Sequence, residues 1–180
     1  MKKMILAAVV AVAVLTASAQ KTVMVGGAEM YPSKNIIENA VNSKDHTTLV
    51  AAVKAAGLVE TLQGAGPFTV FAPTNAAFSM LPQGTVETLL KNENKGMLTS
   101  VLTYHVVSGK YNAKDLKGLI RKGNGTAELK TVQGERIWIM EKDGKWWIKD
   151  ENGGMAEITI ADVNQSNGVI HVINSVLMPK

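Results

Sequence analysis

Hydrophobic and polar positions repeat with two different periods along this chain. In the first half, apolar residues recur every three or four positions, as on one face of a helix. The clearest stripe comprises Leu49, Ala52, Val53 and Ala56. Asp45 is its expected N-cap, and Gly57 is well placed to end it. Similar patterns predict short helices around residues 36–41, 74–81, 86–90, 97–102 and 112–116.

After residue 125 the period falls to two, which is typical of strands. Residues 136–140 and 145–149 flank Lys142-Asp143-Gly144, a turn that predicts a β-hairpin. Residues 157–163 and 168–177 are expected to form two further strands, and residues 68–72 an earlier short one. Helices therefore dominate the first half and strands the second, which indicates an α+β fold.

Residues 1–19 have the pattern of a secretory signal peptide. Two lysines precede an apolar run from Met4 to Leu15, and Ala17-Ser18-Ala19 supplies the small residues of a cleavage site before Gln20. The run is shorter than the roughly 20 residues of a membrane-spanning helix. We therefore expect no transmembrane segment in the mature chain and a secreted protein, either periplasmic or extracellular and at the cell surface.

The chain of 180 residues fits one domain that follows a targeting segment. Residues 20–34 are expected to be a flexible lead-in, and residues 35–180 a single domain. The sequence has no Cys, which excludes disulfides, thiolate metal sites and a cysteine nucleophile. His46, His105 and His171 are too far apart for a local metal-ligand spacing, and no catalytic motif is present. We therefore expect no enzyme, no cofactor and no metal.

Positive charge is concentrated in one part of the chain. Residues 110–149 hold ten basic and five acidic residues, whereas residues 20–109 are neutral in balance. Such an excess attracts anionic polymers or phosphates, although it is also compatible with an ordinary solvated face of lysines. A secreted protein without an RNA-binding aromatic signature is not expected to bind nucleic acid.

Three segments carry a family resemblance. The run Phe68-Thr69-Val70-Phe71-Ala72-Pro73-Thr74-Asn75-Ala76-Ala77-Phe78 resembles the first signature of the fasciclin domain family. Tyr104-His105-Val106-Val107 is similar to its central Tyr-His motif, and residues 167–179 resemble its closing signature. The signature residues expected to build the fold are Thr69, Phe71, Pro73, Thr74, Asn75, Phe78, Asn167, Gly168, His171 and Pro179.

The resemblance implies a wedge-shaped β-sandwich with several helices packed on it, and a role in extracellular adhesion. In animal members the Tyr-His region is implicated in integrin contact, which makes Tyr104 and His105 candidate contact residues. Asn174 stands where many members have Asp. The residues themselves favour a structural role for His105 and His171, because a buried histidine normally bonds to the backbone and orders the core. The alternative is a paired-histidine metal or proton site, which contact in the folded chain could create.

All three tryptophans, Trp138, Trp146 and Trp147, lie in the predicted hairpin. Neighbouring residues of a strand point to opposite faces, so at least one of the adjacent pair is exposed unless both faces are covered. An exposed Trp beside Lys145 would suit an acidic glycan or a partner protein. The alternative is that the tryptophans only cover one face of the sheet.

These features predict a secreted, non-catalytic interaction module for attachment to a cell surface, a matrix or a biofilm. Its expected partner is a surface or matrix protein, a glycan, or a second copy of the chain. The alternative function is an extracellular binding protein for a small apolar ligand or an acidic glycan.

Overall fold

The computed structural model describes residues 21–180, and the expected signal peptide, residues 1–19, lies outside the described residues. The helices are α1 (Ile36–Ala40), α2 (Thr47–Ala56), α3 (Val59–Gln63), α4 (Asn75–Ser79), α5 (Thr85–Leu89), α6 (Lys95–Tyr104) and α7 (Ala113–Lys122), with 3-10 turns η1 (Lys44–His46) and η2 (Asn92–Asn94). The strands are β1 (Val23–Val25), β2 (Ala28–Met30), β3 (Phe68–Pro73), β4 (Val106–Ser108), β5 (Thr126–Lys130), β6 (Arg136–Lys142), β7 (Lys145–Lys149), β8 (Met155–Gln165) and β9 (Gly168–Ile173). The predicted α+β class, with most helices in the first half, is confirmed.

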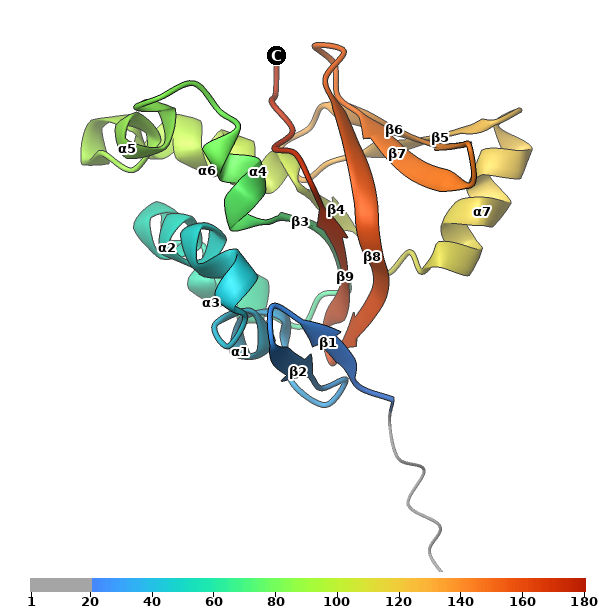
Figure 1. Ribbon diagram of the computed structural model, residues 1–180, viewed down its shortest axis with the longest axis horizontal. Helices are drawn as coiled ribbons and strands as arrows, with labels where there is room; N and C mark the ends of the chain where they lie inside the picture. The colour runs from blue at the N-terminus through green and yellow to red at the C-terminus, as the bar shows by residue number, and fades with distance from the viewer. Residues whose placement is uncertain (1–20) are drawn as a thin grey trace, which may run out of the picture.

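A seven-stranded sheet forms the centre of the molecule, in the order β4-β3-β9-β8-β7-β6-β5. β3 and β9 run parallel, and the other neighbouring strands of this sheet run antiparallel. The sheet bends until its two ends meet, where Val107 pairs with Thr131 and the Val132 N–H donates to the Val106 carbonyl at 2.7 Å. The expected sandwich is therefore built from one sheet bent on itself (Figure 1).

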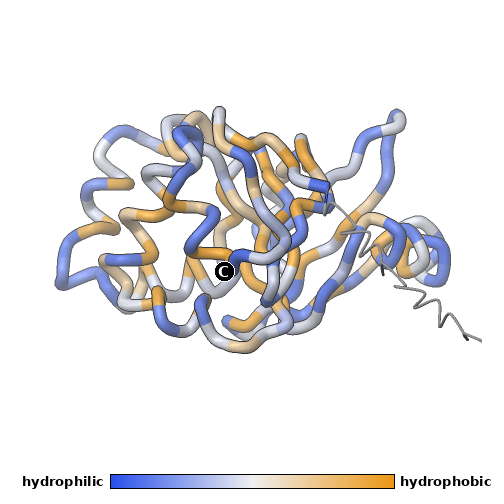
Figure 2. Tube along the Cα trace, turned by 90° about the horizontal axis from the view of Figure 1, so that it is seen from below, coloured by the Kyte–Doolittle hydropathy of each residue, from blue (hydrophilic) through white to orange (hydrophobic). Residues whose placement is uncertain are grey.

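The bent sheet separates two hydrophobic cores, because the central strands β3 and β9 are buried on both faces. Val70, Ala72, Ile170 and Val172 point into the core beneath helices α1–α6. On the opposite face, Phe71 and Ile173 pack with residues of α7 and β5–β7 in the second core. Figure 2 shows the same division, with hydrophobic segments towards the interior and hydrophilic ones on the outer turns.

Helix α2 follows the predicted stripe: Leu49, Ala52, Val53 and Ala56 are its buried residues. Gly57 ends it in the left-handed conformation, with φ of 74°. Asp45 is not its N-cap, because the turn η1 occupies residues 44–46. The side chain of Asn75, at the start of α4, instead accepts from the Thr48 N–H at 3.0 Å. A residue of the first signature thus caps a helix elsewhere in the chain.

The expectation of a flexible lead-in is wrong for residues 23–30. They form the hairpin β1–β2, which turns at Gly26 and Gly27 with φ of 58° and 76°. Val25 and Met30 are only 2% and 3% exposed and belong to the core beneath the helices. Two adjacent glycines suit such a turn because both of its central residues need positive φ. Each strand has only three residues, too few to show a strand period in the sequence.

The hairpin predicted around Asp143 and Gly144 is present as β6–β7. Both turn residues have positive φ, 55° and 71°, as the two-residue type I′ turn requires. Several other bounds differ from the expectation; for example, β8 spans Met155–Gln165 instead of 157–163. Helix α7 continues to Lys122, since its stripe is completed by Ile120, and β9 ends at Ile173.

Substitution of Gly168 tests the close contact between β3 and β9. A Cβ at this position would lie 2.1 Å from the Phe68 carbonyl oxygen, which is far inside van der Waals contact. We expect Gly168→Ala to lower the free energy of unfolding by at least about 2 kcal/mol in urea denaturation. The matched control is Gly118→Ala in helix α7, where a Cβ meets nothing within 4 Å. This control variant should raise the free energy of unfolding by about 0.5–1 kcal/mol. Equal changes in the free energy of unfolding for the two variants would contradict the close contact at Gly168.

Candidate functional site

The polar residues of the signatures are used to hold loops onto the sheet. The Thr69 hydroxyl donates to the Gly109 carbonyl at 2.7 Å and accepts from the Tyr111 N–H at 2.9 Å. Thr74 caps α4 by accepting from the Ala77 N–H at 3.2 Å. These side chains are therefore engaged in the fold.

Asn167 joins two helix ends to the turn between β8 and β9. Its Oδ1 accepts from the Ile36 N–H, at the start of α1, at 3.1 Å. Its Nδ2 donates to the carbonyls of Leu62 and Gly64, at the end of α3, at 2.8 and 2.9 Å. One amide therefore satisfies backbone groups that the two helices leave unpaired.

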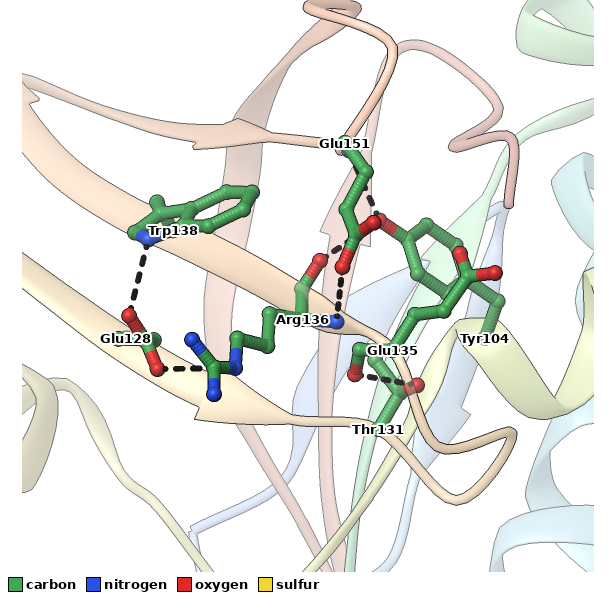
Figure 3. A network of polar contacts seen from close by, with 7 residues as sticks. All are labelled: Tyr104, Glu128, Thr131, Glu135, Arg136, Trp138 and Glu151. Carbon is green, nitrogen blue, oxygen red and sulfur yellow. Dashed lines mark hydrogen bonds and ion pairs between the residues drawn. The ribbon is translucent and has the colours of Figure 1, made fainter. Parts of the chain in front are cut away.

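Tyr104 and His105, the expected contact residues, are buried, with 0% and 2% of their surface exposed. The Tyr104 hydroxyl donates to the Arg136 carbonyl at 2.8 Å and accepts from the Glu151 N–H at 3.1 Å (Figure 3). A partner cannot touch either side chain while the domain is folded. The expectation that they form a contact surface is wrong, because Tyr104 packs in the second core and His105 is buried against the C-terminal segment.

His105 fastens the C-terminal segment to helix α6. Its Nε2 accepts from the Leu177 N–H at 2.9 Å, so the ring proton lies on Nδ1, which donates to the Val101 carbonyl at 2.7 Å. Burial lowers the pKa of His105 to about 4. The imidazole is therefore neutral at pH 7, and both of its nitrogens are engaged.

His171 has the opposite tautomer. Its Nδ1 accepts from the Asp162 N–H at 3.3 Å, and its Nε2–H donates to the Tyr111 carbonyl at 2.8 Å. The ring stacks on Phe71, with centroids 5.7 Å apart. Burial lowers the pKa of His171. Asp162 lies in an irregular part of β8 and also accepts from the Ala113 N–H, so this group ties α7 to the sheet.

The last residues of the chain are held by the turn after β7. The buried carboxylate of Asp150 accepts from the Met178 N–H at 3.1 Å. The Asn152 side chain donates to the carbonyls of Met178 and Pro179 at 2.9 and 3.0 Å. Together with the bond from Leu177 to His105, these contacts show that the closing signature and the Tyr-His motif form one structural unit.

No group of three or more metal-ligating His, Asp or Glu side chains occurs within residues 21–180. In the same part of the chain, no helix is long and apolar enough to cross a membrane. The Nδ1 of His46 lies 2.9 Å from the Ser43 hydroxyl. Burial lowers the pKa of His46 as well.

The two adjacent tryptophans point to opposite sides of the sheet, as the strand period requires. Trp146 packs against the second core, on the same face as the buried Ile148. Trp147 pairs with Met140 on the neighbouring strand β6, and Trp138 lies two residues from Met140 on the same face. Trp138 and Trp147 are both half-buried. We call the surface formed by this side of β5–β8 the outer face.

The outer face also carries an excess of positive charge. Arg136 and Lys145 pair with Glu128 and Glu157, at 3.2 and 2.9 Å. The Nε1–H of Trp138 donates to the second Glu128 oxygen at 3.3 Å, which anchors the ring (Figure 3). The exposed lysines that remain on this face are Lys130, Lys142 and Lys149, for which no ion pair occurs among the described residues.

A small apolar cavity lies between the helices and the sheet. Its volume is about 70 Å³, and its lining includes Ile37, Val53, Leu62, Val70 and Ile170. It is a separate feature from the outer face, since its lining comes from the core beneath α1–α6.

Comparison with known proteins identifies the family. The family model described as fasciclin domain matches residues 44–179. The chain belongs to the fasciclin domain family. Relatives in this family include Protein sll1483 of Synechocystis sp., which is 46% identical over 160 residues covering 89% of this chain and 82% of the relative. Another is the cell surface glycolipoprotein MPB83 of Mycobacterium bovis, 36% identical over 145 residues covering 78% of this chain and 58% of the relative.

The fold is also found in a solved structure. A fasciclin domain pair from the insect cell adhesion molecule Fasciclin I superposes with a TM-score of 0.71, covering 81% of this chain and 51% of that one. The two sequences are 20% identical, so this likeness concerns the fold. The predicted fasciclin resemblance is thereby confirmed.

The buried histidines predict a loss of stability in acid. The unfolded chain binds a proton at His105 near pH 6.5, whereas in the folded protein the pKa is lowered to about 4. The free energy of unfolding should therefore be highest above pH 6.5 and fall as the pH drops towards 4. His105 alone should contribute a loss of roughly 3 kcal/mol, measurable by urea denaturation across this range.

NMR of the histidine side-chain nitrogens provides the control. At pH 7 the spectrum should show His105 protonated at Nδ1 and His171 protonated at Nε2. Signals of two charged imidazoles, or of the same tautomer at both sites, would contradict the hydrogen bonds described above.

Proposed function

We propose that this protein is a secreted, non-catalytic adhesion module whose contact surface is the outer face of β5–β8. The observation that carries the proposal is the contrast between the two candidate regions. Tyr104, His105 and His171 are buried and bonded to the backbone, whereas the outer face presents two tryptophans and exposed lysines. Tryptophan is enriched among residues that dominate binding energy.

The chemistry of the histidines supports a role without catalysis. His105 and His171 each use both ring nitrogens in bonds to the backbone. A general base needs a nitrogen that reaches substrate and a pKa near the working pH, and burial lowers the pKa of both groups. Neither histidine is therefore equipped to move a proton to or from a substrate.

The proposed location is outside the cytoplasm, in the periplasm or at the cell surface. Residues 1–19 have the charged, apolar and small-residue regions of a secretory signal, with the cleavage site before Gln20. The relative MPB83 is a cell surface glycolipoprotein. The solved fasciclin domains come from a cell adhesion molecule.

The size of the internal cavity argues against one form of the alternative function, the binding of a small apolar ligand in the core. The cavity has a volume of about 70 Å³. An engineered cavity of about 150 Å³ is needed to hold benzene in a protein core. A ligand larger than a few atoms would have to displace core side chains.

Adhesion can be tested with the mature chain, residues 20–180, coupled to beads. Bead retention is counted on the producing cells, on extracellular matrix and on an inert surface, beside an unrelated protein of similar charge. We expect selective retention on at least one biological surface. Retention equal to that of the control protein on all three would overturn the proposal.

The two adjacent tryptophans provide matched variants for this assay. Trp147→Ala should reduce bead retention and lower the free energy of unfolding by less than about 1 kcal/mol, because the side chain lies on the outer face. Trp146→Ala should lower the free energy of unfolding by about 2–3 kcal/mol, because it removes contacts with the second core. At a temperature where Trp146→Ala is folded, its bead retention should be unchanged. Loss of retention for Trp146→Ala together with a large loss of stability for Trp147→Ala would contradict the assignment of Trp147 to the outer face and Trp146 to the core.

A further inference from the structure

The aromatic residues of the outer face form a platform on two neighbouring strands. Trp147 lies opposite Met140, and Trp138 occupies the diagonal position in the register. Diagonal neighbours on adjacent antiparallel strands are about 7 Å apart. The Trp138 ring is held in place by its bond to Glu128 (Figure 3). Two half-buried indoles on one face of the sheet, of which Trp138 is anchored, suit a ligand that stacks through planar apolar faces.

The charges around this platform indicate whether its ligand is an anion or a cation. Glu128 and Glu157 are each paired with a cation of the same face. Lys130, Lys142 and Lys149 add three further positive charges on β5, β6 and β7. Because both carboxylates are already neutralised, the face as a whole attracts an anion whose charges are spread along its length.

We propose that the outer face binds an acidic polysaccharide, with sugar rings stacked on Trp138 and Trp147 and carboxylates paired with the three lysines. The proposal rests on the proposed function, for which it names the class of partner. A polyuronate offers both features that the face requires: pyranose rings with apolar C–H faces and one carboxylate on each ring. Their regular spacing matches a surface on which aromatic and cationic side chains lie side by side.

The same features argue against a protein partner. The centres of protein interfaces are depleted of lysine and have apolar side chains that enter pockets. Here lysines lie on three of the four strands that form the face, next to the aromatic rings. A single-stranded nucleic acid also combines stacking rings with negative charge, and the experiment below distinguishes it from a polysaccharide.

The test measures binding of the mature chain to polygalacturonate by biolayer interferometry, with neutral dextran and a single-stranded oligonucleotide as comparison ligands. We expect binding to polygalacturonate that weakens with added salt, and none to dextran. Trp147→Ala should weaken it at least tenfold. The triple variant Lys130→Gln, Lys142→Gln, Lys149→Gln should weaken it more than tenfold.

A second triple variant on helix α7, Lys114→Gln, Lys117→Gln, Lys122→Gln, is the matched control, because it removes the same charge from a different surface. It should change the affinity less than threefold. Equal losses for the two triple variants, absence of binding to polygalacturonate, or tighter binding to the oligonucleotide would each overturn the proposal.

The bead assay separates this proposal from the proposed function. If the triple variant of the outer face loses retention together with polygalacturonate binding, the polysaccharide proposal is supported. If that variant keeps full retention on cells or matrix, the protein is still an adhesion module, but the polysaccharide site proposed here is wrong. If the unmodified chain binds polygalacturonate yet is never retained, the site stands and the adhesion function fails.

Discussion

The parallel pairing of β3 with β9 is the constraint on which the rest of this domain depends. It places residues 68–73 beside residues 168–173, and both strands are buried on each face. Where a buried strand ends, the backbone N–H and C=O groups of the adjoining loops are also buried, and each needs a hydrogen-bond partner. The close contact at Gly168, the bonds of Asn167 and the hydroxyl of Thr69 all serve this requirement. The signature residues are therefore best understood as parts of one hydrogen-bonded frame around the central strands.

This frame explains why Tyr104, His105 and His171, which look chemically active in the sequence, have no free polar group. His105 and His171 bond to backbone atoms through both ring nitrogens, and Tyr104 joins the turn after β7 to β6 through its hydroxyl. Each group is satisfied because an unpaired polar atom in the core is costly. Burial lowers the pKa of both histidines for the same reason, since it disfavours the charged form. Such groups stabilise the fold at neutral pH and destabilise it in acid.

Local patterns predicted most of the elements but not what they contact. The stripe of α2 and the turn at Asp143-Gly144 follow from spacing and side-chain chemistry alone. The hairpin β1–β2 was missed because three-residue strands are too short to show a period. His105 bonds to Leu177, 72 residues away, and the Tyr104 hydroxyl bonds to Arg136 and Glu151, 32 and 47 residues away, so no local pattern reveals these contacts. For Trp146 and Trp147 the sequence predicted opposite faces, but only the sheet order decides which face is the core.

The location of the outer face follows from how the sheet is built. Helices α1–α6 lie over the half that contains the parallel pair, where both faces must be covered. The half formed by β5–β7 is antiparallel, and antiparallel strands tolerate water on one side. Side chains alternate between the two faces along these strands, so isoleucines lie on the inner face, while Trp138, Trp147, lysines and Glu128 lie on the outer face. A surface on this half can change its side chains without disturbing the central frame, so recognition and folding are carried by different parts of the same sheet.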